Sequence, residues 1–153
     1  MGQLNPLKTF TQLTLGERVD RDAAVVSGSG AANVLFTIAG GRVAINAIIG
    51  QITVVASGAT NLQLQSNPTT GSTAAMCAVL AIGALEAQTL LTIPGAVASA
   101  MYGVSAGLAQ GMTTPQILPI GAIEATSSAA ETVTIKWSVF YTPIDDGAYI
   151  EAA

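Results

Sequence analysis

The sequence predicts an all-β protein, an antiparallel sandwich or barrel, and three observations lead to that prediction. Short runs of Val, Ile, Leu and Thr alternate between apolar and polar side chains, which is the period of a half-buried strand. Turn residues interrupt these runs at intervals of about 8–14 residues, a spacing typical of sandwiches and barrels. Half of the residues are hydrophobic but only 5% are aromatic, and small or β-branched side chains suit packed sheets better than ligand pockets. At 153 residues we expect one domain.

Residues 1–30 are predicted to be an extended N-terminal arm, so that the β-sandwich domain spans residues 31–153. The arm contains a cluster of five charged residues between positions 17 and 22. It ends in Ser-Gly-Ser-Gly at positions 27–30, which is a flexible joint. The alternative is an ordinary first strand in which residues 23–26 pair at a sheet edge, and both interpretations can hold together.

The first strands of the sandwich are expected on either side of Gly40-Gly41. Residues 34–39 alternate as a strand does, and the two glycines suit a hairpin turn. Apolar side chains share one face over residues 43–49, and Gly50 marks an expected bulge or bend. Extended structure continues over residues 52–55.

Four further segments are assigned from the same signals. The strands expected at residues 61–67 and 89–93 each end next to a proline, and residues 68–72 form a loop between strands. Residues 74–86 are predicted to be either a buried strand or a short helix, because periodicity does not separate the two for a short apolar run.

The last third of the chain contains the clearest strand signal. Residues 95–116 are expected to be loop and irregular strand, and residues 117–123 extended with Pro119 at an edge position. Residues 132–141 alternate strictly, and a turn follows at residues 145–147. The face expected to be buried consists of Val133, Ile135, Trp137, Val139 and Tyr141.

Several of these strands are apolar on both faces, although one face of a strand in a single small sandwich should meet water. The pairs are Ile48-Ile49, Val54-Val55 and Leu90-Leu91. The long stretch between Arg42 and Glu124 also contains one charged side chain, Glu86. Two-sided apolar strands and low charge predict that outer surfaces are buried against other copies, in a homo-oligomer.

The composition argues against several classes of function. The chain has no His, so the usual general base and a common metal ligand are missing. A net charge of −4 with five Lys plus Arg argues against binding to nucleic acid and against electrostatic attachment to a membrane. The most apolar stretch, residues 74–93, includes Glu86 and leads into Pro94, so no membrane span is expected. We therefore expect no enzyme activity, cofactor or metal, and synthesis in the cytoplasm because no leader signal is visible.

The remaining candidates for chemistry have simpler interpretations. The carboxylate pairs Asp20/Asp22 and Asp145/Asp146 lie in polar segments and are interpreted as solvated, and a Ca²⁺ site at residues 145–147 has too few oxygen ligands nearby. Cys77 lies in an apolar run and is predicted to be a buried, inert thiol. Trp137 and Tyr149 are candidates for stacking on a sugar, but Trp137 shares a face with aliphatic residues, which favours a core position.

Two segments resemble a known family. Residues 131–153 contain Lys136-Trp137, then Tyr141-Thr142-Pro143, and the chain stops a few residues later. Residues 41–53 read Gly-Arg-Val-Ala-Ile-Asn-Ala-Ile-Ile-Gly-Gln-Ile-Thr. Both segments resemble small capsid decoration (cement) proteins in the heads of tailed bacteriophages. The resemblance covers residues 33–66 and 130–153.

The resemblance implies a jelly-roll-like fold, a homotrimer and a place on the outside of the major capsid shell, where the protein stabilises the virion. It carries over no functional residue. A phage tail or fibre component and a carbohydrate-binding β-sandwich module stay open as alternatives. Contacts with the capsid protein or with a neighbouring copy are expected from the arm, whose apolar residues precede a charged, hinge-terminated segment. The candidate contact residues are Leu4, Pro6, Leu7 and Phe10.

Overall fold

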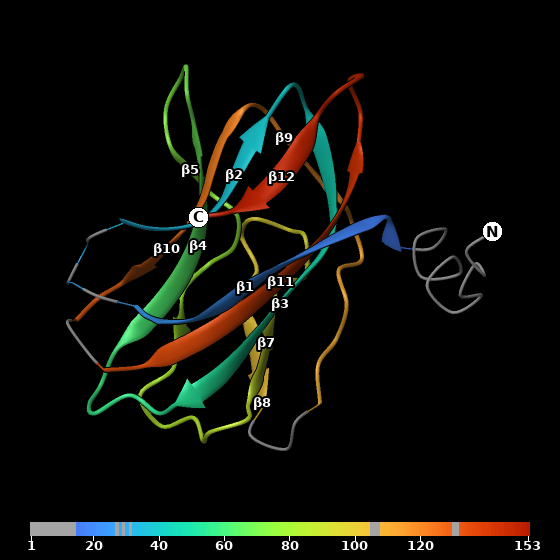
Figure 1. Cartoon of the computed structure of the whole chain (residues 1–153). Coiled ribbons are helices and arrows are strands. Elements are labelled where there is room, and N and C mark those ends of the chain that lie inside the picture. The colour runs from blue at the N-terminus through green and yellow to red at the C-terminus, as the bar shows by residue number, and fades with distance from the viewer. Residues whose placement is uncertain (1–14, 27, 29, 31, 105–107, 130–131) are drawn as a thin grey trace.

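The computed structural model describes residues 15–26, 28, 30, 32–104, 108–129 and 132–153. They form two antiparallel sheets of six strands each, packed face to face as a sandwich (Figure 1). The predicted all-β sandwich is therefore confirmed. Sheet I consists, in spatial order, of β1 (Glu17–Val25), β11 (Thr134–Pro143), β3 (Val43–Val54), β7 (Leu90–Thr92) and β8 (Tyr102–Val104), with β9 (Gln116–Leu118) also beside β3. Sheet II consists of β12 (Tyr149–Ala152), β2 (Ala32–Ala39), β10 (Gly121–Ser127), β4 (Asn61–Pro68) and β5 (Ala74–Ala75), with β6 (Leu80–Ala81) also beside β4.

The strand pairings are nested. β2 pairs with β12, β3 with β11, β4 with β10, and β7 with β8, so the chain runs out along one set of strands and returns along the other. Partners in the outermost pair are more than 100 residues apart in sequence, since Ile38 lies opposite Ile150. The fold is therefore held by long-range pairing and has few local hairpins.

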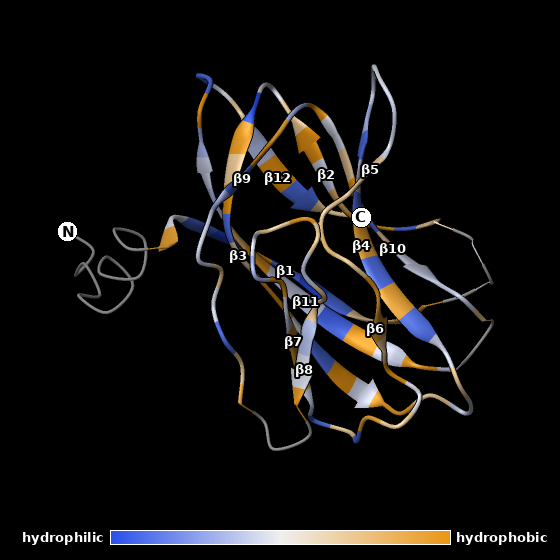
Figure 2. Ribbon diagram, turned by 180° about the vertical axis from the view of Figure 1, so that it is seen from behind, coloured by the Kyte–Doolittle hydropathy of each residue, from blue (hydrophilic) through white to orange (hydrophobic). Residues whose placement is uncertain are grey.

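The core lies between the two sheets and follows the predicted alternation. The five side chains expected on the inner face of the last long strand, from Val133 to Tyr141, are all buried. Leu62 and Leu64 of β4 are fully buried too, and Figure 2 shows the alternating apolar and polar bands along that strand. Because the apolar residues recur with a period of two, each strand presents one face to the core.

Gly50 lies in an unbroken strand, so the expected bulge is wrong. β3 pairs with β11 through Gln51–Lys136, Gly50–Trp137 and Ile49–Ser138 without a shift of register. A Cβ at Gly50 would lie 2.7–2.9 Å from three ring carbons of Trp137. Gly50 therefore leaves the space that the indole fills, which is the close approach that glycine in a strand often marks.

The expected hairpin at Gly40-Gly41 is also wrong. β2 belongs to sheet II and β3 to sheet I, so the turn carries the chain from one sheet to the other. Gly40 has a φ of +75°, and a Cβ there would lie 2.0 Å from the carbonyl oxygen of Gly147. The glycine signal marked a real turn, but the best partners of β2 are the distant strands β10 and β12.

The first described strand changes the expected domain boundary. β1 pairs antiparallel with β11 from Glu17–Tyr141 to Val25–Thr134, as an edge strand of sheet I. The edge-strand alternative therefore describes this segment, and the strand is longer than residues 23–26. The sandwich includes β1, and what is left of the expected arm, residues 1–14, lies outside the described residues.

The segments that were hardest to assign form short, interrupted edges. Residues 74–86 contain no helix; β5 and β6 flank a turn in which Met76 and Cys77 enter the core. In the stretch expected to be irregular, β8 and the first residues of β9 are the ordered strands. Residues 117–123 do not form one strand, because β9 stops before Pro119 and β10 starts at Gly121. The last strand, β12, was not expected from the sequence.

Candidate interaction surface

An apolar groove opens on one side of the sandwich, between β5 of sheet II and β9 of sheet I. Its volume is about 340 Å³. Its lining residues include none that carries a charge; they are Ser66, Pro68, Ser72, Ala74, Ala75, Met76, Val97, Gln116, Ile117, Leu118 and Pro119. An uncharged groove of this kind favours an uncharged, partly apolar occupant.

Two strand edges border the groove without a partner strand among the described residues. β5 pairs only with β4, and β9 pairs only with β3, so each leaves one edge unpaired on the groove side. Ile117 and Val97, 66% and 61% exposed, project beside these edges. Unpaired edges next to exposed apolar side chains form a template for an added strand.

Gln116 connects the two walls of the groove. Its side-chain amide donates hydrogen bonds to the carbonyl oxygens of Met76 at 2.7 Å and Gly95 at 2.9 Å. The amide oxygen of the same side chain is buried and has no hydrogen-bond partner. The groove therefore has fixed walls and one acceptor whose hydrogen bond is missing.

The described chain starts one strand away from this groove. The Asn46 side-chain amide donates to the carbonyl oxygen of Leu15 at 2.9 Å and to the hydroxyl of Thr142 at 2.8 Å. Asn46 lies on β3, and nearby on the same strand Ala44 pairs with Ile117 of β9. Residues 1–14 are therefore attached to the sandwich at a point close to β9.

Other exposed apolar side chains gather at the far end of sheet I. Val25 and Val54 lie on either side of Thr134 in one row across β1, β11 and β3, and they are 51% and 50% exposed. Val55 follows at 45%. The strands expected to be apolar on both faces behave unequally: Ile48 and Leu91 are fully buried, whereas Val54 and Val55 form this surface row.

The acidic residues of the predicted turn at 145–147 have a structural role. The Arg42 guanidinium donates to both carboxylate oxygens of Asp145, at 2.6 and 2.9 Å, and the Arg42 backbone N–H donates to one of them at 2.7 Å. These bonds lower the pKa of Asp145 to about 2. The pair joins the Gly40-Gly41 crossover to the turn before β12. Among the described residues, no three His, Cys, Asp or Glu side chains are grouped to hold a metal ion.

Sequence reasoning missed the buried carboxylate of Glu124. It is 4% exposed and accepts hydrogen bonds from the side-chain amides of Gln65 at 3.1 Å and Asn67 at 2.9 Å. The signal was present in the sequence, since both amides alternate with the buried leucines of β4 and so share a face. The carboxylate is satisfied by neutral donors and serves to pair β10 with β4.

The other charged residues of the N-terminal cluster attach β1 to β11. Ser138 and Arg18 donate hydrogen bonds to Asp20, and Tyr141 donates to Glu17 at 2.8 Å. Partial burial raises the pKa of Asp20, but the hydrogen bonds from Ser138 and Arg18 outweigh it, so its pKa is below the ordinary value. Burial, with Glu17 adding to it, raises the pKa of Tyr141. These contacts are those of a strand edge.

The two side chains with potential reactivity or stacking are in the core. Cys77 is fully buried, and burial raises the pKa of its thiol, so the predicted buried thiol is confirmed. Trp137 is 1% exposed, as the core interpretation predicts. Tyr149 is 46% exposed at the edge of sheet II.

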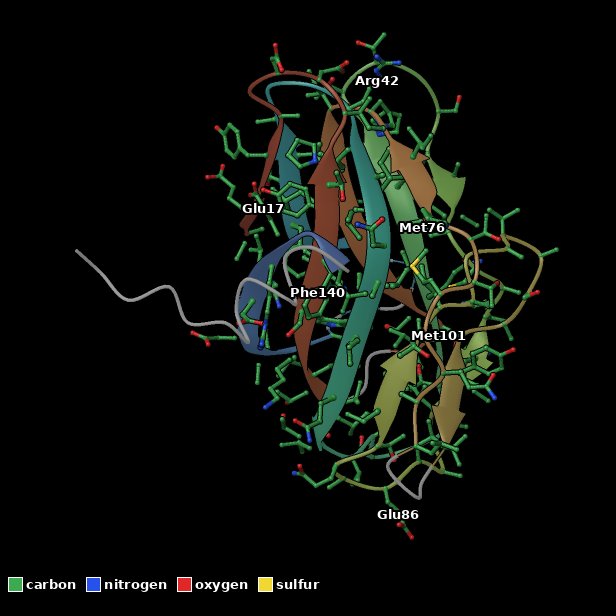
Figure 3. All side chains as sticks on the ribbon, turned by 90° about the vertical axis from the view of Figure 1, so that its right-hand side faces the viewer. Glu17, Arg42, Met76, Glu86, Met101 and Phe140 are labelled. Atoms are coloured by element: carbon green, nitrogen blue, oxygen red, sulfur yellow. The ribbon has the colours of Figure 1, made fainter. Side chains whose placement is uncertain are left out.

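Charged side chains are placed at the ends and at one edge of the molecule. Figure 3 shows Arg42 and Glu86 at opposite ends of the sandwich, with Glu17 near the β1 edge. No helix in the described part of the chain is long and apolar enough to span a membrane. The predicted contact residues Leu4, Pro6, Leu7 and Phe10 all lie outside the described residues.

Comparisons with protein-family models, curated proteins and solved structures found no match to this chain.

Proposed function

We propose that the protein is a capsid decoration protein of a tailed bacteriophage, which self-associates, as a trimer, and binds the outside of the major capsid shell. The observation that carries the proposal is the uncharged apolar groove with two unpaired strand edges, on a sandwich with little surface charge. Such a surface suits permanent association with other protein and has little chemistry of its own.

Two further features support the proposal. The segment that resembles decoration proteins, residues 131–153, supplies β11, at the centre of sheet I, and β12, at the edge of sheet II. The nested strand pairing agrees with the jelly-roll-like fold that the resemblance implies. The resemblance therefore falls on residues that organise the whole sandwich.

The mechanism is cooperative clamping of neighbouring capsid subunits. A trimer presents each contact surface three times, and once one surface is bound the others are held near their sites at high effective concentration. Many modest apolar contacts then stabilise the shell against the pressure of packaged DNA. No single strong site and no chemical step are needed.

A carbohydrate-binding module is the rival of a different class. Trp137 is buried behind Gly50 and presents no ring to a ligand. The exposed Tyr102 and Tyr149 lie on β8 and β12, which belong to different sheets, so they do not form one stacking platform. A tail or fibre role shares the same interaction surface and is separated from decoration by the partner.

Co-sedimentation with empty shells of the major capsid protein encoded beside this gene tests the proposal. We expect saturable binding of the full chain and a higher temperature of shell disruption when it is bound. A variant lacking residues 2–14 keeps β1 intact and should bind about tenfold more weakly or worse. Failure of the full chain to co-sediment would overturn the decoration role; equal binding by the shortened chain would overturn only the role of residues 2–14.

A further inference from the structure

We propose that the groove between β5 and β9 is occupied by the N-terminal segment, residues 4–10, of a second copy of this chain. The segment adds an extended strand to the unpaired edges and places its apolar side chains in the groove. This inference rests on the self-association part of the proposed function and names the residues that carry it.

The groove offers what such a segment needs. The unpaired edges of β5 and β9 provide backbone donors and acceptors for an extended chain, and Ala74, Met76 and Leu118 form apolar lining. The buried amide oxygen of Gln116 has no donor, and a backbone N–H of an inserted strand is the kind of group that supplies one. Exposed Ile117 and Val97 would then lose contact with water.

The N-terminal segment matches the groove in chemistry and length. Of residues 1–14, only Lys8 has a charged side chain, and Leu4, Leu7 and Phe10 recur at intervals of three residues. Fourteen extended residues span up to about 45 Å. Since Leu15 is fixed on Asn46 of β3, the segment has the reach to enter a neighbouring molecule packed against this side.

The path of the described chain favours a neighbouring copy over the same molecule. From Glu17, beside β11, to Leu15, bound to β3, the chain crosses the strands of sheet I. An occupant of the groove has to run along β5 and β9 instead. Residues 7–14 contain no Gly, Pro, Asn or Asp, which are the residues that supply tight turns. The segment therefore has no turn signal with which to bend into the groove beside its own anchor.

Disulfide trapping in the full-length protein tests the inference. The test variant carries Leu7→Cys and Val97→Cys; the matched control carries Leu7→Cys and Val25→Cys, since Val25 is similarly exposed but lies at the far end of sheet I. The native Cys77 is fully buried, and its raised pKa keeps it out of the exchange. Both substituted positions on the sandwich are exposed, so both variants are expected to fold.

The expected result is a ladder of covalent oligomers on a non-reducing gel for the Val97 variant, at least severalfold stronger than for the Val25 variant. A disulfide confined to single chains would overturn the inference in favour of closure within one molecule. Equal ladders in test and control would overturn it as well. Shell binding is measured separately: trapping without co-sedimentation removes the decoration role and keeps the inference, and co-sedimentation without trapping does the reverse.

Discussion

At the scale of single residues, the core is built around contacts between side chains and bare backbone. Trp137, the only tryptophan, lies over Gly50 of the neighbouring strand, so the largest side chain of the core is matched by the smallest residue opposite it. Outside the core, the bidentate pair of Arg42 and Asp145 joins two turns that are more than 100 residues apart. Both contacts are specific to single side chains and so can be tested by single substitutions.

Gly50→Ala is expected to destabilise the protein by about 1–3 kcal/mol, because the added methyl group overlaps the Trp137 ring. Denaturant unfolding, followed by the fluorescence of that tryptophan, measures the change. The control is Gly111→Ala, since a Cβ there has no atom within 4 Å. If the two substitutions have the same effect on the free energy of unfolding, the close packing of Trp137 on Gly50 is wrong.

The Asp145 pair predicts a dependence of stability on pH. Arg42 lowers the pKa of Asp145 in the folded state from 3.8 to about 2. Its contribution is therefore complete above about pH 4 and is lost as the pH falls towards 2. Asp145→Asn should lower the melting temperature at neutral pH, and the difference from the wild type should disappear near pH 2. A difference that stays constant over this range, or an equal loss in Asp146→Asn, would contradict the role of the pair.

At the scale of strands, the sequence predicted local alternation well and long-range pairing poorly. The inner face of β11, from Val133 to Tyr141, and the end of β4 at Pro68 agree with the pattern because both depend on residues close in sequence. The partner of β2 does not, because Gly40-Gly41 suits a hairpin equally well as a crossover, and only the distant strand β10 decides between them. The four-residue β12 was missed because it is too short to display a period.

The groove and Glu124 were beyond prediction for the same reason. Two strand edges that border one groove, β5 and β9, are about 40 residues apart, and their proximity follows from the packing of two sheets. Glu124 looks in the sequence like any surface charge; its burial depends on amides from a neighbouring strand.

Deletion of β1 residues gives a test at this scale. Removal of residues 2–14 leaves every described strand in place, so the melting temperature should stay nearly unchanged. Removal of residues 2–22 also deletes most of β1 and exposes the edge of β11; the lost burial of Val19 alone is worth about 1–2 kcal/mol. Differential scanning calorimetry compares the two. Equal melting temperatures would contradict the assignment of β1 to the sandwich.

At the scale of the whole molecule, low charge and exposed apolar side chains act together. The surface row of Val25, Val54 and Val55 and the groove side chains Val97 and Ile117 lie on different parts of sheet I and its margins. A protein with such a surface gains from burying it, and few like charges oppose the approach of a second copy.

The purified protein is accordingly expected to be a trimer at micromolar concentration, with a mass about three times the 15.3 kDa of one chain. Size-exclusion chromatography with light scattering measures this mass. Ile117→Lys places a charge at the groove and should shift the protein towards monomer, whereas Val25→Lys should shift it less. A stable monomer from the unmodified chain would contradict self-association in solution.

Electron cryomicroscopy of capsid shells with and without the added protein tests the central claim most directly. The account predicts extra density on the outer surface of the shell, at positions of threefold or quasi-threefold symmetry, into which three β-sandwiches fit with their grooves facing neighbouring copies. Shells that remain undecorated at saturating protein, or density found only on the tail or its fibres, would contradict it.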